Sequence, residues 1–229
     1  MLQMRAVQAG FGSSVVLRDV TVELAPGQTT VLIGRNGAGK TTMLRAIMGL
    51  VPIARGTLNL DGVDLLHQPA HARAALGVGY APEDRRLIAS FTVEENLLLP
   101  LLALRAPAPL RSQRLAEVYH LMPQLAELRG RPGGYLSGGQ GKMAALGRAV
   151  MVGTRVVLLD EPFQGLATAL ANTYTETLRR VRTQRKDLAL LITESSPKLV
   201  RRIADAALRI ERGGVAPADL DTWASSRRI

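Results

Sequence analysis

The chain has 229 residues and a formal net charge of +10, and 47% of its residues are hydrophobic while only 3% are aromatic. This length accommodates one α/β domain with a sizeable core, and the lack of cysteine excludes disulfides, thiolate metal sites and a cysteine nucleophile. The most apolar stretch, 97–104, contains Pro100 and is too short to span a bilayer, and we expect no signal peptide from residues 1–5.

Short apolar runs, many of them rich in β-branched residues, alternate along the chain with segments of helical periodicity. The predicted strands are 15–17, 20–24, 29–33, 56–62, 78–82, 156–162, 188–193 and 207–210. The predicted helices are 43–48, 94–130 with a break around Pro107 and Pro109, 143–150, 169–186, 198–206 and 218–225. This alternation predicts a mostly parallel sheet with right-handed crossovers.

Phe11 lies between two glycines near the start of the chain. A ring in this position is exposed on a flexible backbone, so it can stack on a base, or it can be a small anchor for a β-hairpin. The residues alone do not decide between these two interpretations. Further along, Thr92 and Glu95 predict a capping box, which opens the helical segment 94–130. A helical block between two strands indicates a subdomain insert.

Residues 34–42 match the phosphate-binding loop pattern G-x-x-x-x-G-K-[S/T] at every fixed position, between a predicted strand and a predicted helix. Glycines let successive backbone N–H groups converge on phosphate oxygens, and the helix N-terminus adds partial positive charge. Lys40 can reach the terminal phosphates, and the hydroxyl of Thr41 can bind Mg²⁺. The alternative, a glycine turn without a ligand, rarely matches the whole pattern. The predicted cradle is Gly34, Arg35, Asn36, Gly37, Ala38, Gly39, Lys40, Thr41 and Thr42.

Asp160 and Glu161 stand at the carboxyl end of a predicted buried strand, which is where ligands of open α/β sheets bind. Asp160 can hold Mg²⁺ opposite the hydroxyl of Thr41. Glu161 can orient or deprotonate an attacking water. The alternative is an acidic pair that caps the next element at the surface. The phosphate loop upstream favours the metal ligand and the base.

Three segments, 34–42, 136–140 and 156–161, in this order and spacing resemble the ATP-binding cassette (ABC) ATPases, and the resemblance runs from about Leu2 to Val215. The signature segment, residues 136–140 with the sequence Leu-Ser-Gly-Gly-Gln, is specific to that family among phosphate-loop proteins. A finer resemblance, to the ATPase subunits of branched-chain amino acid, urea and amide importers, is carried by three further segments. These are 92–97, 115–119 and 165–167.

The resemblance implies a P-loop NTPase fold of the ABC ATPase type, which is α/β with a mostly parallel sheet, an antiparallel β subdomain and a helical insert. It implies a single ABC ATPase domain over 1–229, in which 1–87 and 151–229 form a RecA-like lobe with the β subdomain and 88–150 form the helical signature subdomain. It also implies a dimer in which each ATP lies between the phosphate loop of one subunit and the signature segment of the other.

The resemblance assigns roles to individual residues. Phe11 would stack on adenine, Thr41 and Asp160 would hold Mg²⁺, and Glu161 would be the catalytic base beside the phosphate cradle. The residues that would face the ATP of the partner subunit are Ser137, Gly138, Gly139 and Gln140. A serine hydroxyl and N–H groups at a helix N-terminus suit phosphate binding.

Several positions depart from the family pattern. Glu83 stands where the Q-loop glutamine is expected, and Ser195 stands where the switch histidine is expected. Serine is too short to reach a γ-phosphate as histidine does, and it carries no positive charge. Ala167 replaces the D-loop aspartate, as in the importer subfamily. Gly141 and Lys142 follow the signature segment where glutamines are usual, and Gly141 weakens a helix by roughly 1 kcal/mol relative to alanine.

Glu83 and Ser195 belong to this chain's own ATP site, whereas the signature segment, which serves the partner, is intact. These departures favour a subunit that completes a competent site in a different ATPase while its own site turns over slowly. The alternative is a fully competent site, which the retained Glu161 supports.

The resemblance implies an ATP-hydrolysing importer subunit on the cytoplasmic face of the membrane, bound to a second ATPase subunit and two transmembrane permeases, with an extracytoplasmic binding protein as an indirect partner. Two alternatives remain: a nucleotide-binding regulatory subunit with little turnover, and an ABC ATPase without a transporter. The basic pairs are dispersed and few aromatics accompany them, so we expect a solvated basic surface, or a surface beneath anionic lipid, and no nucleic-acid partner. The sequence does not identify the cargo.

Overall fold

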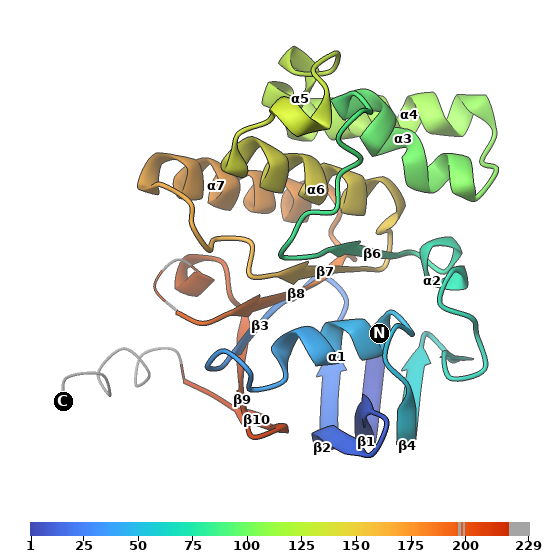
Figure 1. Cartoon of the computed structure of the whole chain (residues 1–229), viewed down its shortest axis with the longest axis vertical. Helices are drawn as coiled ribbons and strands as arrows, with labels where there is room; N and C mark the ends of the chain where they lie inside the picture. The colour runs from blue at the N-terminus through green and yellow to red at the C-terminus, as the bar shows by residue number, and fades with distance from the viewer. Residues whose placement is uncertain (197, 199, 220–229) are drawn as a thin grey trace.

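A six-stranded sheet forms the centre of the molecule in the computed structural model, which describes residues 1–196, 198 and 200–219 (Figure 1). Its strand order is β10-β9-β3-β8-β7-β6, and only the pair β9 and β10 is antiparallel. The strands are β3 Thr29–Ile33, β6 Val78–Ala81, β7 Val156–Asp160, β8 Ala189–Glu194, β9 Ala206–Glu211 and β10 Gly214–Pro217. The predicted, mostly parallel sheet is therefore confirmed.

Every residue of β3, β7 and β8 is buried, which explains why these strands are continuous apolar runs rather than alternating patterns. Successive side chains point to opposite faces of the sheet and enter two different cores. Leu159 packs toward one core and Leu158 toward the other. The sheet thus separates two apolar layers, and its strand ends lie between them.

A second, four-stranded antiparallel sheet has the order β2-β1-β4-β5. Its strands are β1 Leu2–Phe11, β2 Ser14–Leu24, β4 Ile53–Leu60 and β5 Val63–Asp64. The sequence predicted two separate strands at 15–17 and 20–24, and that was wrong. The structure has one long strand with an irregularity at Asp19, which takes a left-handed conformation (φ 52°). The pairing with β1 shifts register between Val7 and Ala9 and continues on both sides of it, so the strand is not interrupted.

The α-helices differ from the predicted ones mainly in their ends. They are α1 Lys40–Ile47, α2 Ala72–Ala75, α3 Val93–Ala103, α4 Ala108–Leu121, α5 Pro123–Glu127, α6 Gly138–Val152 and α7 Thr168–Gln184. The segment predicted as 94–130 forms α3, α4 and α5, with breaks before Pro107 and Pro123. The capping box is confirmed, since the side chain of Thr92 accepts from the N–H of Glu95 and the carboxylate of Glu95 accepts from the N–H of Thr92.

The predicted helix 198–206 was wrong for the part of the chain that the structure describes. Only a 3-10 turn, η2 Val200–Arg202, forms there, and β9 begins at Ala206. Residues 197 and 199 lie outside the described residues. The same holds for most of the predicted helix 218–225, of which only 218 and 219 are described. Another 3-10 turn, η1 Gly133–Tyr135, precedes α6.

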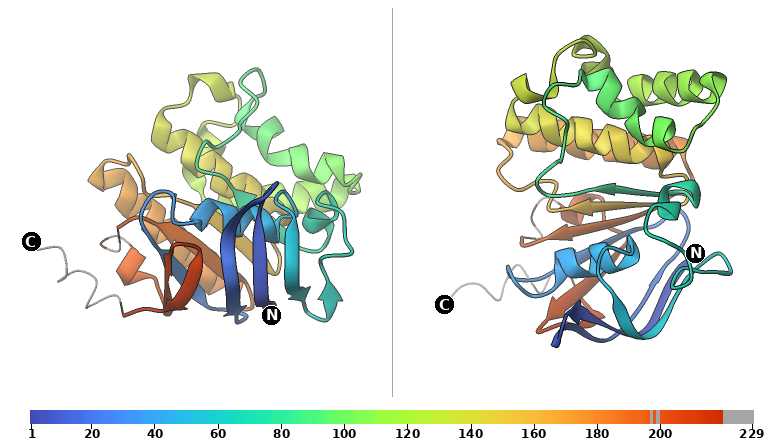
Figure 2. Two further views of the ribbon diagram at one scale, coloured as in Figure 1. Left: turned by 60° about the horizontal axis from the view of Figure 1, so that its bottom comes forward. Right: turned by 45° about the vertical axis from the view of Figure 1, so that its right-hand side comes forward.

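Helices cover both faces of the six-stranded sheet (Figure 2). On one face lie α6 and α7, with α3, α4 and α5 above them, and on the other lie α1 and the antiparallel sheet (Figures 1 and 2). The C-terminal half of α6 packs closely on β6, because a Cβ atom added at Gly79 would lie 2.1 Å from the carbonyl oxygen of Ala149. Only glycine permits this approach of helix and strand.

One arginine after α7 joins three helices. The guanidinium of Arg185 donates to the carboxylate of Glu117 in α4 at 2.7 Å, and to the carbonyls of Val150 and Gly153 at the end of α6, both at 2.8 Å. Its side chain is only 10% exposed. This contact fixes the ends of α6 and α7 and the outer helix α4 to one another.

We expect Arg185→Met to lower the free energy of unfolding by about 3 kcal/mol, because two carbonyls and a carboxylate lose their donor. Chemical denaturation measures the loss. The control is Arg179→Met, which breaks an exposed ion pair with Glu176 and should cost less than about 0.5 kcal/mol. Equal losses in the two variants would contradict the role assigned to Arg185.

Candidate active site

A pocket of about 350 Å³ opens where β3 and β7 end and α1 begins. Segments far apart in the sequence meet in it, since the phosphate loop, Glu83 and the segment 161–164 all contribute. Its lining is Asn36, Gly37, Gly39, Lys40, Thr41, Thr42, Glu83, Glu161 and Gln164. The carboxyl ends of parallel strands are where open α/β sheets bind ligands.

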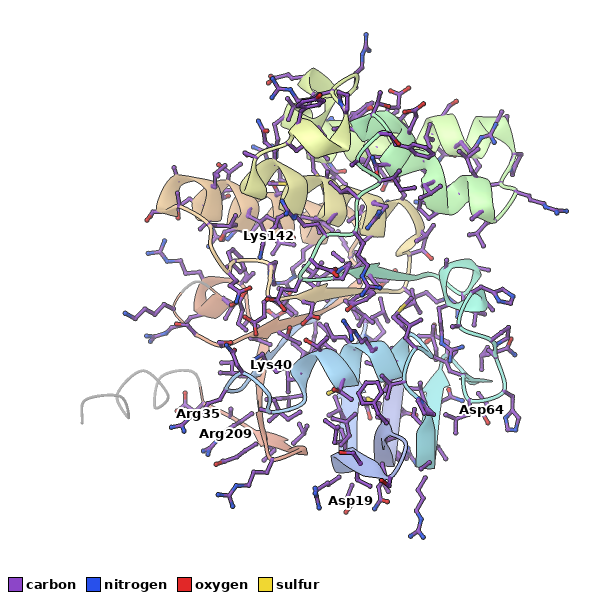
Figure 3. The ribbon with its side chains drawn as sticks, in the orientation of Figure 1. Asp19, Arg35, Lys40, Asp64, Lys142 and Arg209 are labelled. Carbon is purple, nitrogen blue, oxygen red and sulfur yellow. The ribbon has the colours of Figure 1, made fainter. Side chains whose placement is uncertain are left out.

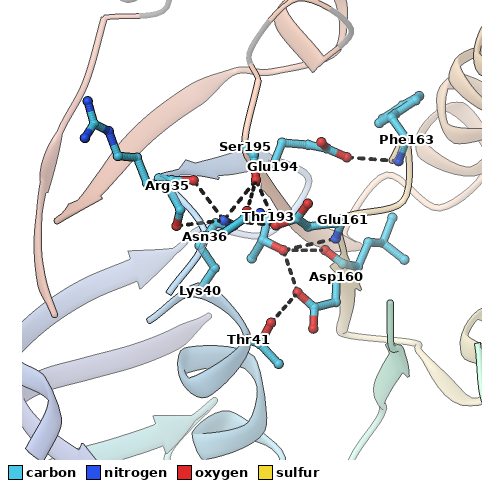
Figure 4. Close-up of polar contacts among 12 residues, drawn as sticks. Arg35, Asn36, Lys40, Thr41, Asp160, Glu161, Phe163, Thr193, Glu194 and Ser195 are labelled. Carbon is cyan, nitrogen blue, oxygen red and sulfur yellow. Dashed lines mark hydrogen bonds and ion pairs between the residues drawn. The ribbon is translucent and has the colours of Figure 1, made fainter. Parts of the chain in front are cut away.

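The phosphate loop has the backbone shape that anion binding needs. Gly37 and Gly39 have φ values of 79° and 114°, a region that favours glycine, and α1 starts directly after Gly39 without a side-chain cap. First-turn N–H groups of α1 are thus available to an anion. The ammonium of Lys40 is buried and donates to the carbonyls of Gly34 at 2.8 Å and Arg35 at 3.1 Å, while the guanidinium of Arg35 points away from the site (Figure 4).

Asp160 at the end of β7 is held by three hydroxyl groups. Thr193 donates to it at 2.8 Å, Thr41 at 3.1 Å and Tyr80 at 3.3 Å. Burial raises the pKa of Asp160, and the neighbouring Glu161 acts in the same direction, while the three hydrogen bonds oppose them. The ionised form of such a carboxyl gains strongly from a nearby cation.

The oxygen atoms at Asp160 and Thr41 fit Mg²⁺, which prefers oxygen ligands and keeps several waters or phosphate oxygens. Within the described residues, no three His, Cys, Asp or Glu side chains gather as a metal cage. This donor set suits an ion that arrives with the phosphates of a nucleotide and is shared with them. The residues present therefore fit a magnesium ion of that kind.

Glu161 has an unusual backbone for a residue with a side chain, with φ at 44°. Its N–H donates to the carbonyl of Thr193 at 3.1 Å and to the hydroxyl of the same residue at 3.2 Å. Its carbonyl accepts from the ammonium of Lys142 at 2.6 Å. These contacts turn the carboxylate toward the phosphate loop, where it forms an ion pair with Lys40 at 2.9 Å.

Ser195 touches the charged groups of the site rather than extending toward solvent (Figure 4). Its hydroxyl oxygen lies 2.9 Å from a carboxylate oxygen of Glu161, 2.9 Å from the side-chain oxygen of Asn36, and accepts from Lys40 at 3.2 Å. A hydroxyl has one proton, so it can donate to Glu161 or to Asn36 but not to both at once. The serine thus contacts Glu161, the predicted base, and the phosphate-loop lysine directly.

The structure adds residues that the sequence did not single out. Glu194 at the end of β8 is buried, and its carboxylate accepts from the N–H of Phe163 at 2.9 Å. Burial raises the pKa of Glu194 to about 7. Tyr80, Thr193 and Gln164 were also missed. The one signal in the sequence for these residues was the polar pair Thr193 and Glu194 at the end of an apolar run, because the ends of the parallel strands face the site.

The signature segment and Phe11 lie apart from this pocket, and neither contributes to its lining. Ser137 caps α6, because its hydroxyl accepts from the N–H of Gln140 and the side chain of Gln140 accepts from the N–H of Ser137. A Cβ atom added at Gly138 would meet nothing within 4 Å, whereas one added at Gly139 would lie 2.5 Å from the side chain of Leu170. Phe11 ends β1 and is 53% exposed.

The sequence matches a family model described as ABC transporter over residues 17–164. It is 32% identical over 219 residues to the high-affinity branched-chain amino acid transport ATP-binding protein BraG of Pseudomonas aeruginosa, covering 96% of this chain and 92% of that protein. It is 31% identical to the probable branched-chain amino acid transport ATP-binding protein LivF of Archaeoglobus fulgidus (94% and 90%). It is also 31% identical to the lipopolysaccharide export system ATP-binding protein LptB of Acidithiobacillus ferridurans (95% and 89%).

Among solved structures, an ATP-binding subunit of an ABC transporter is similar to this chain, with a TM-score of 0.83 and 27% identity, over 99% of this chain and 92% of that one. A cassette in its ADP conformation has the same TM-score of 0.83 at 23% identity, over 100% of this chain and 96% of that one. The fold predicted from the sequence is thereby confirmed.

We expect Glu161→Gln to slow hydrolysis at this site by about 10²- to 10⁴-fold, because the amide cannot act as a base. The same variant should bind MgADP more tightly than the parent, since a neutral side chain no longer competes for Lys40. Single-turnover hydrolysis and calorimetry measure the two effects. Glu176→Gln, on an exposed part of α7, is the control. Unchanged turnover together with weaker MgADP binding would contradict the assignment.

We expect Glu194→Gln to stabilise the fold at pH 8 but not near pH 4.5. The pKa of Glu194 rises from 4.5 to about 7 on folding, so the stability gained from its protonated form is lost as the pH rises from 4.5 through 7. Glutamine keeps an oxygen for the N–H of Phe163 and never ionises. Unfolding measured at both pH values should show a gain of about 1 to 3 kcal/mol at pH 8 only. A gain of the same size at both values would rule out ionisation as its cause.

Proposed function

Because this chain belongs to the ABC transporter family of ATPases, we propose that it is the ATP-hydrolysing subunit of an importer for branched-chain amino acids or related small polar solutes. BraG and LivF are similar over nearly the whole chain and are named for branched-chain amino acid transport. LptB is named for lipopolysaccharide export at a similar identity, so the choice of cargo class rests on the finer motifs 92–97, 115–119 and 165–167.

One observation carries the enzymatic role: the phosphate loop and Glu161 line a single pocket, and the buried Asp160 accepts a hydrogen bond from Thr41 of that pocket. Lys40 and the N–H groups that open α1 bind the phosphates, and Thr41 and Asp160 hold Mg²⁺. When bound, the magnesium ion neutralises charge on the phosphate oxygens. Glu161 takes the proton of the attacking water.

The partners follow from the position of the signature segment. Residues 137–140 lie outside the pocket of their own chain, at the N-terminus of α6, and this supports a role in the ATP site of a second ATPase subunit. Phe11, exposed at the end of β1, stacks on the adenine held by its own chain. We assign 1–87 and 151–229 to the catalytic lobe and 88–150 to the signature subdomain.

Two permease subunits carry the cargo through the membrane, and an extracytoplasmic binding protein delivers it. Within the part of the chain that the structure describes, none of the helices has the length and apolar character needed to cross a bilayer. This agrees with a peripheral subunit on the cytoplasmic face, bound to the permeases.

The substitutions at Glu83 and Ser195 support an asymmetric pair in which this site is the slower one. Glu83 brings a carboxylate to the pocket, and Ser195 contacts Lys40 and Glu161, whereas a histidine would extend toward the γ-phosphate. A regulatory subunit that binds nucleotide with little turnover is the second candidate, favoured by the same two residues. The retained Glu161 favours hydrolysis.

The test uses the purified chain and the reconstituted transporter. Mg-ATP should bind the chain, and Lys40→Ala should weaken binding by at least about tenfold, because a charge-assisted contact with phosphate is lost. In the transporter, Glu161→Gln should reduce transport less than the same change of the base in the other ATPase. No affinity for Mg-ATP would refute the function. Equal loss from the two base substitutions would refute the asymmetry alone.

A further inference from the structure

Lys142 joins two parts of the molecule that serve different ATP sites. It lies on α6, whose N-terminal end carries Ser137 and the rest of the signature segment. Its ammonium nevertheless contacts a residue of the pocket of its own chain, since it donates to the carbonyl of Glu161 at 2.6 Å. Figure 3 shows Lys142 above the strand ends, facing the region of Lys40 from the opposite side.

The carbonyl that Lys142 contacts belongs to Glu161, whose backbone conformation is unusual. Glu161 has a left-handed conformation, which is uncommon for a residue with a side chain. Strand β8 holds its N–H through Thr193, and Lys142 holds its carbonyl. The direction of the Glu161 carboxylate is therefore set from one side by the central sheet and from the other side by the signature helix.

Three carboxylates lie around Lys142. Burial lowers the pKa of Lys142, and Arg85 acts in the same direction, while Glu194, Glu83 and Glu161 oppose this shift because they stabilise the positive charge. Two of these carboxylates, Glu83 and Glu161, line the nucleotide pocket. Lysine thus supplies a cation beside an acidic group that stands where the family has a neutral glutamine.

Gly141 lies where α6 comes close to Arg85, in the segment that follows Glu83. A Cβ atom added at Gly141 would lie 3.0 Å from the side chain of Arg85. Arg148, two turns further along α6, donates to the carbonyls of Arg85 at 2.6 Å and Arg86 at 2.7 Å. The segment that follows Glu83 is thus packed against α6 along the face of Gly141 and Arg148, next to the face that carries Lys142.

We propose that Lys142 is a positioning residue that makes the orientation of Glu161 depend on the placement of the signature helix in the same subunit. This rests on the proposed function, in which Glu161 is the base and Ser137 contacts the ATP of the partner. Lys142 follows Ser137 by five positions, about 7.5 Å along the helix axis. When the N-terminus of α6 shifts on contact with the partner's ATP, the ammonium that fixes Glu161 shifts with it. Hydrolysis in this subunit thereby responds to occupancy of the other site.

The test compares Lys142→Met, which removes the donor and the charge, with Lys142→Arg, which keeps both. The assay is ATP hydrolysis by the assembled transporter in which the base of the second ATPase is changed to glutamine, so that turnover reports on this site. K142M should lower kcat by about tenfold or more and leave KM within about twofold, because orientation of the base matters in the transition state and not for binding. K142R should recover most of kcat. The control is Lys186→Met on an exposed surface, which should leave both constants unchanged.

A second measurement does not depend on turnover. Amide hydrogen exchange over 160–166 should be faster in K142M than in the parent and close to the parent in K142R. K142Q, whose shorter amide falls short of the carbonyl, replaces K142M if that variant does not fold. An unchanged kcat together with unchanged exchange overturns the proposal, and so does an arginine variant as defective as the methionine one. A parent protein that does not bind Mg-ATP would instead refute the proposed function.

Discussion

A buried ion pair between Lys40 and Glu161 is the contact on which the candidate site depends. The two side chains are 4% and 8% exposed, and their charged atoms lie 2.9 Å apart. Loss of one partner from such a pair leaves an uncompensated charge, typically at a cost of about 3 to 5 kcal/mol. The phosphate groups of a nucleotide bring other anionic oxygens to the same ammonium. Nucleotide binding would therefore exchange one partner of Lys40 for another and release the carboxylate of Glu161, the base in the proposed function.

The parallel sheet is what brings these groups together. Because β3, β7 and β8 run in the same direction, the residues that follow them all emerge at one edge, and the phosphate loop, Asp160 and Ser195 come from three different strand ends. Two apolar layers enclose the sheet on either side, and the pocket opens at this edge between them. Thr193 links two of these groups, since its hydroxyl donates to Asp160 and accepts from the N–H of Glu161.

The sequence predicted the features that are encoded locally. The phosphate loop, the buried strand 29–33 and the capping box at Thr92 depend on neighbouring residues, and each formed as expected, while the strand predicted at 156–162 formed but ends at Asp160. The features that the sequence did not predict depend on residues that are distant in the sequence. The irregular pairing at Asp19 joins β2 into a single strand, and the roles of Tyr80 and Lys142 exist only because β6 and α6 fold beside β7. No periodicity or motif in a single sequence carries that information.

The close packing of Gly79 on Ala149 has a mechanical consequence. It fixes the C-terminal half of α6 to backbone atoms of the central sheet, whereas the opposite end touches only side chains, with Leu170 2.5 Å from a Cβ atom added at Gly139 and nothing within 4 Å of one added at Gly138. A helix of 15 residues is about 22 Å long, so α6 is a lever with its fulcrum at β6. A tilt of about 3° at the fulcrum displaces the far tip by about 1 Å, which is a large step on the scale of a hydrogen bond. The glycine at position 79 thus places the point about which α6 can tilt, and the length of helix beyond that point determines how far its N-terminus moves.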